Sequence, residues 1–122
     1  MDQKTATRIA ALMGLLAVVL GAFGAHALKG ILEGNHTVAV WEKAVFYHFI
    51  HAVVLCVLAQ REPVPRGPFV SFLAGIVIFS GSLYLLALTS TKGFGAVTPL
   101  GGVSFLVGWG WLGLTAGRKR AG

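Results

Sequence analysis

Four long apolar runs, separated by short polar stretches, dominate the pattern of the chain. The uncharged runs cover residues 9–28, 44–59, 68–91 and 93–117, and all but the second are at least 20 residues long. A helix needs about 20 predominantly apolar residues to cross the hydrocarbon core of a bilayer. Because lipid offers the backbone no hydrogen-bond partners, we expect each run to form a membrane-spanning helix.

The polar stretches predict where these helices begin and end. A helix over residues 38–59 extends the short second run, places Glu42 and Lys43 near the headgroups and leaves Thr37 as its N-cap. Pro99 is suited to the first turn of the fourth helix. Three prolines end the second helix and start the third: Pro63, Pro65 and Pro68. The predicted spans are therefore roughly residues 9–28, 38–59, 68–91 and 97–117.

Composition supports a membrane protein. Hydrophobic residues make up 56% of the chain and charged residues only 11%, whereas a soluble domain carries about 25% charged residues. A soluble helical bundle would also need polar stripes, which the first, third and fourth runs lack. We therefore expect residues 1–122 to form a single all-α membrane domain, an integral four-helix bundle. The lone cysteine, Cys56, is expected to be a small buried residue.

Basic residues predict the orientation of the chain. With four spans, the termini and the second loop share one side and hold seven basic residues: Lys4, Arg8, Arg61, Arg66, Arg118, Lys119 and Arg120. The other side holds three: Lys29, Lys43 and Lys92. Positive charge favours the cytoplasmic side, so we expect both N- and C-termini in the cytoplasm of a multi-pass protein of the inner or plasma membrane. Charges scattered at membrane flanks indicate the lipid bilayer as partner and no nucleic acid.

The first run also resembles a signal peptide. Lys4 and Arg8 precede the apolar stretch, and Ala25-His26-Ala27 has the pattern of a cleavage site. However, the apolar part of a signal peptide is about 7–15 residues long. Because this run is longer and rich in glycine, we expect it to be retained as a span.

Small residues recur at positions that allow helices to approach closely in lipid. The candidate packing positions are Ala17, Gly21, Ala25, Gly75, Gly81, Ser104 and Gly108. They favour a tightly packed bundle within one chain over an interface of a homo-oligomer or a larger membrane complex, although both can hold.

Polar side chains gather in one half of the predicted bundle. His48 and His51 are three residues apart and share a helix face. The same depth holds four other polar residues of the candidate cluster: His26, Tyr84, Ser80 and Ser82. Buried ionisable groups in membranes are costly and often functional. Three interpretations stay open: neutral histidines that hydrogen-bond between helices, a metal or haem site built from the three histidines, or a path for protons or a small ligand.

Four ordered motifs resemble a known family. They are residues 21–28 (GAFGAHAL), 47–52 (YHFIHA), 79–84 (FSGSLY) and 98–102 (TPLGG). The chain resembles, over nearly its whole length, the family called domain of unknown function 423, which consists of small multi-span membrane proteins. The resemblance implies a helical membrane protein and supplies no activity, substrate or catalytic residue.

Three functions are considered for a protein with these features. Small size, glycine-rich helix faces and the lack of a catalytic motif favour a non-enzymatic accessory or scaffold protein. A metal, haem or proton-handling protein would use His26, His48 and His51. A small dimeric transporter would need a carboxylate inside a span, and none of the four acidic residues lies clearly in one: Asp2, Glu33, Glu42 and Glu62. We expect no catalytic residues, no enzymatic activity and no cofactor, with a metal or haem as the alternative.

Overall fold

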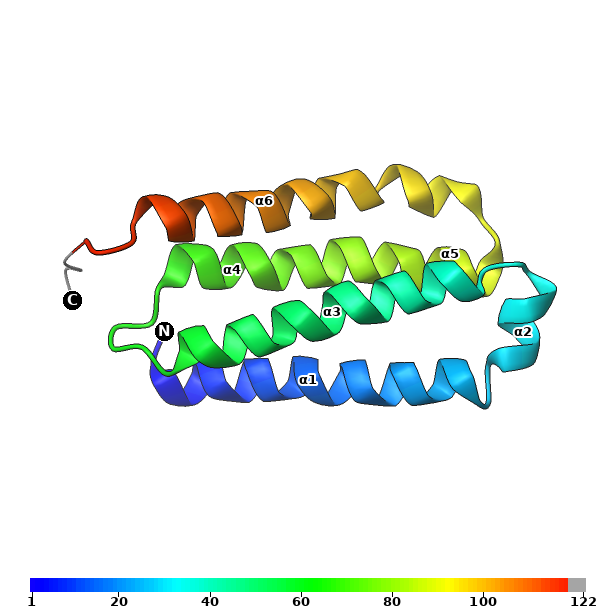
Figure 1. Ribbon diagram of the computed structural model, residues 1–122, viewed down its shortest axis with the longest axis horizontal. Helices are drawn as coiled ribbons and strands as arrows, with labels where there is room; N and C mark the ends of the chain where they lie inside the picture. Colours follow the sequence, from blue (N-terminus) through cyan, green and yellow to red (C-terminus); the bar gives the residue numbers. More distant parts are fainter. Residues whose placement is uncertain (119–122) are drawn as a thin grey trace.

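The computed structural model describes residues 1–118, which fold into helices with no strand among them. The elements are α1 (Gln3–Ala25), α2 (Lys29–Gly34), α3 (Val38–Ala59), α4 (Arg66–Gly75), the π-helix η1 (Ile76–Ser80), α5 (Gly81–Thr89), the 3-10 helix η2 (Lys92–Ala96) and α6 (Thr98–Leu114). Four helices are long and apolar enough to cross a membrane: α1, α3, the continuous helix Arg66–Thr89, and Lys92–Leu114. Consecutive spans run antiparallel to each other (Figure 1).

The spans lie in chain order rather than around a common axis (Figure 1). α1 packs chiefly on α3, α3 packs on the helix built from α4, η1 and α5, and α6 packs chiefly on α4 and η1. The outer spans are consequently less covered: 11% of the apolar window of α1 is buried inside the protein, against 39% for α3. In lipid this exposure costs little, because lipid tails are as apolar as the side chains that face them.

The helix bounds follow the pattern of the sequence in part, since α1 ends at Ala25 rather than at residue 28 and α6 ends at Leu114 rather than at residue 117. α3 covers the residues predicted for it, and α6 begins at Thr98 with proline in its first turn. α1 instead begins several residues earlier than expected, at Gln3, because Asp2 caps it by accepting a hydrogen bond from the Thr5 N–H. Thr37 does precede α3, but its hydroxyl donates to the Ala87 carbonyl on α5 and makes no capping bond.

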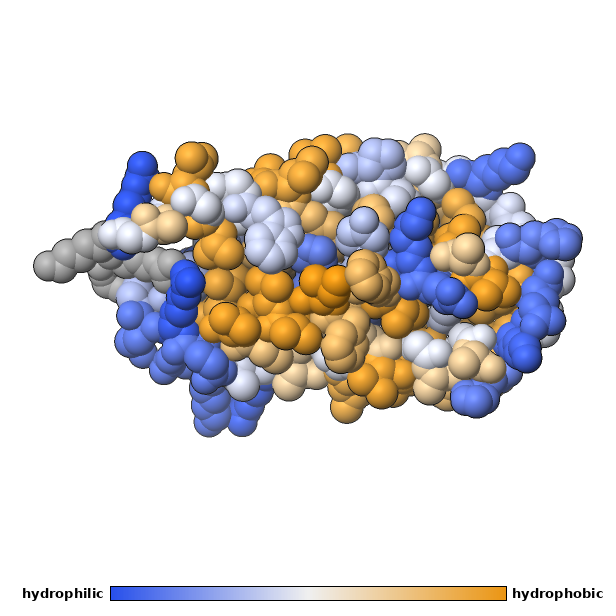
Figure 2. Space-filling view, in the orientation of Figure 1, coloured by the Kyte–Doolittle hydropathy of each residue, from blue (hydrophilic) through white to orange (hydrophobic). Residues whose placement is uncertain are grey.

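Two features of the fold went unpredicted. The short helix α2 fills the loop between the first two spans, and η1 interrupts the third span as one π-helical segment. Both termini of the bundle, the start of α1 and the end of α6, lie at one end, which we call the terminal end; α2 lies at the opposite end, called the α2 end (Figure 1). Hydrophilic residues gather at these two ends, with a largely apolar belt between them (Figure 2).

Candidate functional site

His51 lies in α3, and both of its ring nitrogens are hydrogen-bonded. Its Nδ1 is 2.7 Å from the carbonyl oxygen of Tyr47, and the indole N–H of Trp109 donates to its Nε2 at 3.1 Å. A carbonyl can only accept and an indole N–H can only donate, so Nδ1 carries the proton and the imidazole is neutral. The ring also stacks on Phe105 with centroids 3.8 Å apart. His51 therefore joins α3 to α6 and keeps no free lone pair for a ligand.

His48 lies one turn earlier and contacts different helices. Its Nδ1 is 2.8 Å from the hydroxyl of Tyr84 on α5, and the ring is only 3% exposed. The other nitrogen, Nε2, is buried without a hydrogen-bond partner among the described residues. The backbone of Met13 in α1 lies close to the imidazole ring. His48 thus occupies the junction of α1, α3 and α5, and its Nε2 is the one incompletely bonded atom of the network.

The serines of the predicted cluster bond to the backbone and to a threonine rather than to the histidines. The Ser80 hydroxyl donates to the Ala44 carbonyl at 2.7 Å and so fixes η1 against α3. Ser82 donates to the Phe79 carbonyl, and its hydroxyl lies 2.6 Å from that of Thr98 at the start of α6. The two serines are therefore buried helix contacts, and Tyr84 is the only residue of the third span to bond His48.

The structure separates His26 from the other two histidines. His26 caps the C-terminus of α1, where its backbone N–H donates to the Phe23 carbonyl, and its side chain is exposed. Within residues 1–118 no group of three or more His, Cys, Asp and Glu side chains is arranged to hold a metal ion. The structure therefore does not bring His26, His48 and His51 together. The reason is that α1 ends before His26, so its side chain projects from the end of the helix instead of into the bundle.

Most of the predicted packing positions lie at helix contacts. A Cβ added at Gly108 would lie 2.7 Å from the Phe72 ring, and at Gly21 it would meet Val45 at 3.3 Å. The other three positions at contacts are Ala17, which is buried, Gly75, which faces the Phe105 ring, and Ser104, whose hydroxyl donates to the Ser71 carbonyl.

Three sequence expectations need correction here. Ala25 is exposed, a Cβ at Gly81 would meet nothing within 4 Å, and Cys56 is exposed rather than buried. Each lies on the outward side of its helix, which small or apolar composition cannot distinguish from the inward side in a lipid environment.

A set of hydrogen bonds at the α2 end was not predicted from the sequence. The Thr37 hydroxyl and the Asn35 amide both donate to the Ala87 carbonyl, at 2.7 and 3.1 Å, and the amide also donates to the Leu88 carbonyl. The Trp41 indole donates to the Leu20 carbonyl of α1 at 2.9 Å. The signal in the sequence was the placement of polar and tryptophan side chains beside the start of a span, where carbonyls at neighbouring helix ends lack partners.

The acidic residues lie outside the network. Asp2, Glu33, Glu42 and Glu62 are all exposed. One ion pair is present in the described part of the chain, between Lys29 and Glu33, with 3.9 Å between nitrogen and oxygen. Glu42 therefore offers no buried carboxylate within the single chain, which was the feature required of a transporter.

Comparison with known proteins agrees with this architecture. Residues 20–102 match the family described as "Protein of unknown function (DUF423)". The UPF0382 membrane protein YwdK of Bacillus subtilis is 44% identical over 108 residues, which cover 83% of this chain and 86% of that protein. The UPF0382 membrane protein SAB0533 of Staphylococcus aureus is 42% identical over 106 residues, covering 83% of this chain and 85% of that protein. No solved structure matches. The chain is a small helical membrane protein and belongs to the DUF423 family.

Proposed function

We propose that the protein is a non-enzymatic accessory or scaffold subunit of a larger membrane assembly. One observation carries this proposal: the buried polar side chains of the bundle hold helices together. His51 has both ring nitrogens bonded, and Ser80 donates to α3. A module of this kind offers its partners a fixed helical surface.

The outer spans provide the surfaces for such contacts. Leu15 on α1 is 60% exposed and Leu106 on α6 is 71% exposed, and each belongs to a span that lies mostly outside the core. A partner helix that covered either face would gain van der Waals contact without any need to displace water. A second copy of this chain and a different membrane protein both fit this requirement.

Site-specific crosslinking in native membranes tests the proposal. A photoreactive residue at Leu15 or at Leu106 should yield one reproducible protein adduct, whose mass distinguishes a second copy from another subunit. The matched control is the same residue at Leu55, which is fully buried in the core and should yield no adduct. If both exposed positions crosslink only to lipid, the accessory role is wrong.

We further propose that the protein spans the inner or plasma membrane four times with both termini in the cytoplasm. The support is charge: the terminal end carries five described basic residues against two acidic ones, and the α2 end carries three against two. Lys119 and Arg120, which contribute to the predicted bias, lie outside the described residues.

Cysteine labelling from outside intact cells tests the orientation. In a Cys56→Ser background, a membrane-impermeant thiol reagent should label a cysteine at Glu33 and spare one at Glu62 until the cells are permeabilised. Both positions are exposed, so accessibility within the fold is matched. The reverse pattern would contradict a cytoplasmic location of the termini.

Proton handling is a second candidate, favoured by the buried, unbonded Nε2 of His48 beside the Tyr84 hydroxyl. A pH-sensitive dye inside proteoliposomes measures it. The wild-type protein should then accelerate proton entry over protein-free vesicles, and His48→Gln should abolish that acceleration while Cys56→Ser retains it. Equal rates in wild-type and protein-free vesicles would exclude this function.

A further inference from the structure

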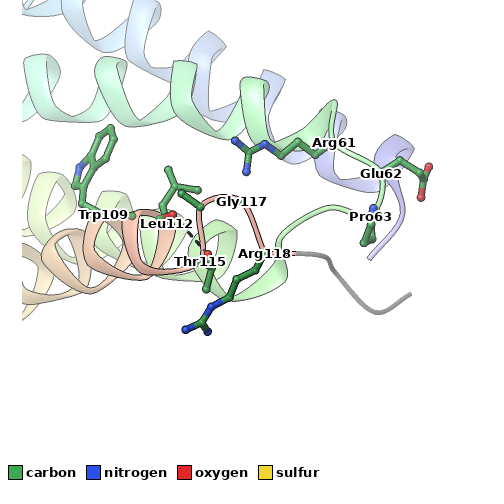
Figure 3. A pocket seen from close by; sticks show the side chains of 10 residues that line it. Arg61, Glu62, Pro63, Trp109, Leu112, Thr115, Gly117 and Arg118 are labelled. Atoms are coloured by element: carbon green, nitrogen blue, oxygen red, sulfur yellow. Dashed lines mark hydrogen bonds between the residues drawn. The ribbon is translucent and has the colours of Figure 1, made fainter.

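A hollow lies at the terminal end, between the α3–α4 loop and the end of α6 (Figure 3). Its volume is about 860 Å³, and part of its wall is apolar. The residues that line it are Arg61, Glu62, Pro63, Trp109, Leu112, Gly113, Thr115, Ala116, Gly117 and Arg118. We call this hollow the Arg61–Arg118 pocket.

The pocket is amphipathic along its depth. Trp109 and Leu112 form its inner wall within α6, while Arg61 and Arg118 lie at its outer rim, beyond the last residues of α3 and α6. Helix ends are also where the hydrocarbon core meets the headgroups. The charged rim and apolar wall therefore have the depth and order of a phospholipid headgroup followed by its acyl chain.

The electrostatics of the rim favour an anion. Neither guanidinium has a hydrogen bond or ion pair to the described part of the chain, so both keep their donors available. Glu62 is the only acidic residue of the lining, and Figure 3 shows its carboxylate directed away from Arg61, whose side chain extends toward Leu112. Arg66 adds charge nearby, since it lines a smaller hollow that shares Arg118.

We propose that the Arg61–Arg118 pocket binds an anionic phospholipid, with the phosphate at the Arg61 guanidinium and an acyl chain along Trp109 and Leu112. The Arg118 side chain extends to the other side of the end of α6 (Figure 3) and contributes positive charge from farther away. Guanidinium groups form paired hydrogen bonds with phosphate oxygens, and basic pockets between spans are suited to anionic headgroups. A soluble phosphate would satisfy the arginines but leave the apolar wall uncovered. Trp109 is 45% exposed, so part of its ring surface is open to contact with an acyl chain.

Fluorescence quenching by brominated lipid tests the proposal, because Trp109 is part of the wall. The complete protein carrying Trp111→Phe is placed in nanodiscs of phosphatidylcholine that contain a fixed fraction of brominated phosphatidylglycerol or of brominated phosphatidylcholine. We expect the phosphatidylglycerol to quench more strongly at equal content. Arg61→Gln should lower that preference by about fivefold, and Arg118→Gln should lower it by less.

A matched pair of variants distinguishes the pocket from general attraction to charge. Lys4→Gln with Arg8→Gln removes two exposed basic residues of the same end, outside the pocket lining, and should leave most of the preference intact. Arg61→Lys with Arg118→Lys keeps the charge but loses the paired geometry and should give an intermediate value. Helical content by circular dichroism confirms the fold of each variant.

Three results would each overturn the proposed lipid site. Equal quenching by the two brominated lipids, or an equal loss in the Lys4 and Arg8 variant, overturns the pocket as a lipid site. Millimolar inorganic phosphate that abolishes the preference would identify a free-phosphate site and overturn the lipid. Because none of these results depends on a protein partner, failure here leaves the proposed accessory role unaffected.

Discussion

The two ends of the bundle differ in how side chains hydrogen-bond to the backbone carbonyls near the helix termini. At the α2 end, side chains from one connection donate to carbonyls of other spans, as Asn35 and Thr37 do to Ala87. At the terminal end, Arg61 and Arg118 border an open hollow and make no such bond to the described residues. The last four carbonyls of any helix lack partners within it, so the α2 end uses these groups to join spans together.

The difference indicates which end is fixed and which can receive a ligand. Trp41 extends the bonded region to α1, so the α2 end links α1, α3 and α5. The terminal end has fewer side-chain bonds between spans. The Gln3 side-chain amide donates to the Gln60 carbonyl at 2.9 Å, and the Gln60 side-chain amide donates to the Thr7 hydroxyl at 3.2 Å. Both hydrogen bonds are exposed. Exposed hydrogen bonds contribute less, because water or headgroups replace them readily.

The largest effect is expected from adding one methyl group at each end. In Gly101→Ala, at the α2 end, the new Cβ would lie 2.6 Å from the Phe79 Cα, so α6 must move away from η1. In Gly67→Ala, at the terminal end, the obstacle is the Trp111 ring, which is 47% exposed and can rotate. Overpacking costs about 1–3 kcal/mol, and we expect Gly101→Ala to reach the upper part of that range and Gly67→Ala to fall below it.

Unfolding in mixed micelles with increasing SDS measures both variants. Gly110→Ala is the control, because its Cβ would meet nothing within 4 Å. Equal destabilisation by the Gly101 and Gly67 substitutions would show that the two ends are equally rigid, contrary to the comparison.

A smaller effect is expected from removing one indole donor at each end. Trp41→Phe leaves the Leu20 carbonyl without its second bond and reduces the contact with Tyr84, whose ring centroid lies 4.7 Å away. Side-chain hydrogen bonds within membranes average about 0.6 kcal/mol, with a maximum near 1.7 kcal/mol. Trp111→Phe is the matched substitution at the terminal end, where the indole makes no hydrogen bond within the described chain, and we expect almost no change. The same SDS titration measures the stability of both variants. A larger loss of stability for Trp111→Phe than for Trp41→Phe would show that the terminal end is the more fixed one.

Sequence alone predicted the four long apolar helices because their signal is local. Run length and prolines were enough to define α3 and the start of α6 at Thr98. The side-chain network was only partly predictable. The contact of His48 with Tyr84 fits the expectation of polar groups at one depth, but the bond of His51 to Trp109 required knowledge of which helix faces α3. In lipid, hydrophobic patterning does not distinguish a face that packs from one that meets lipid. Cys56 was misplaced for that reason.

The smallest effect concerns Asp2, which caps α1 at the terminal end. The backbone N–H of Thr5 donates to its carboxylate at 2.7 Å, and this bond lowers the pKa of Asp2 below its ordinary value of 3.8. A carboxyl whose pKa is lower in the folded state stabilises the fold above its unfolded pKa, and this contribution is lost as the pH falls through the folded value. Wild-type protein should therefore show faster amide exchange in the first turn of α1 below pH 3.8 than above it, after correction for intrinsic exchange rates. Asp2→Asn keeps a capping oxygen without the charge and should show no such dependence, while Asp2→Ala should exchange quickly at every pH. Because Asp2 is exposed and caps only one helix, neither variant should alter the α2 end, and a change in exchange at Thr37 would mean that the two ends are coupled after all.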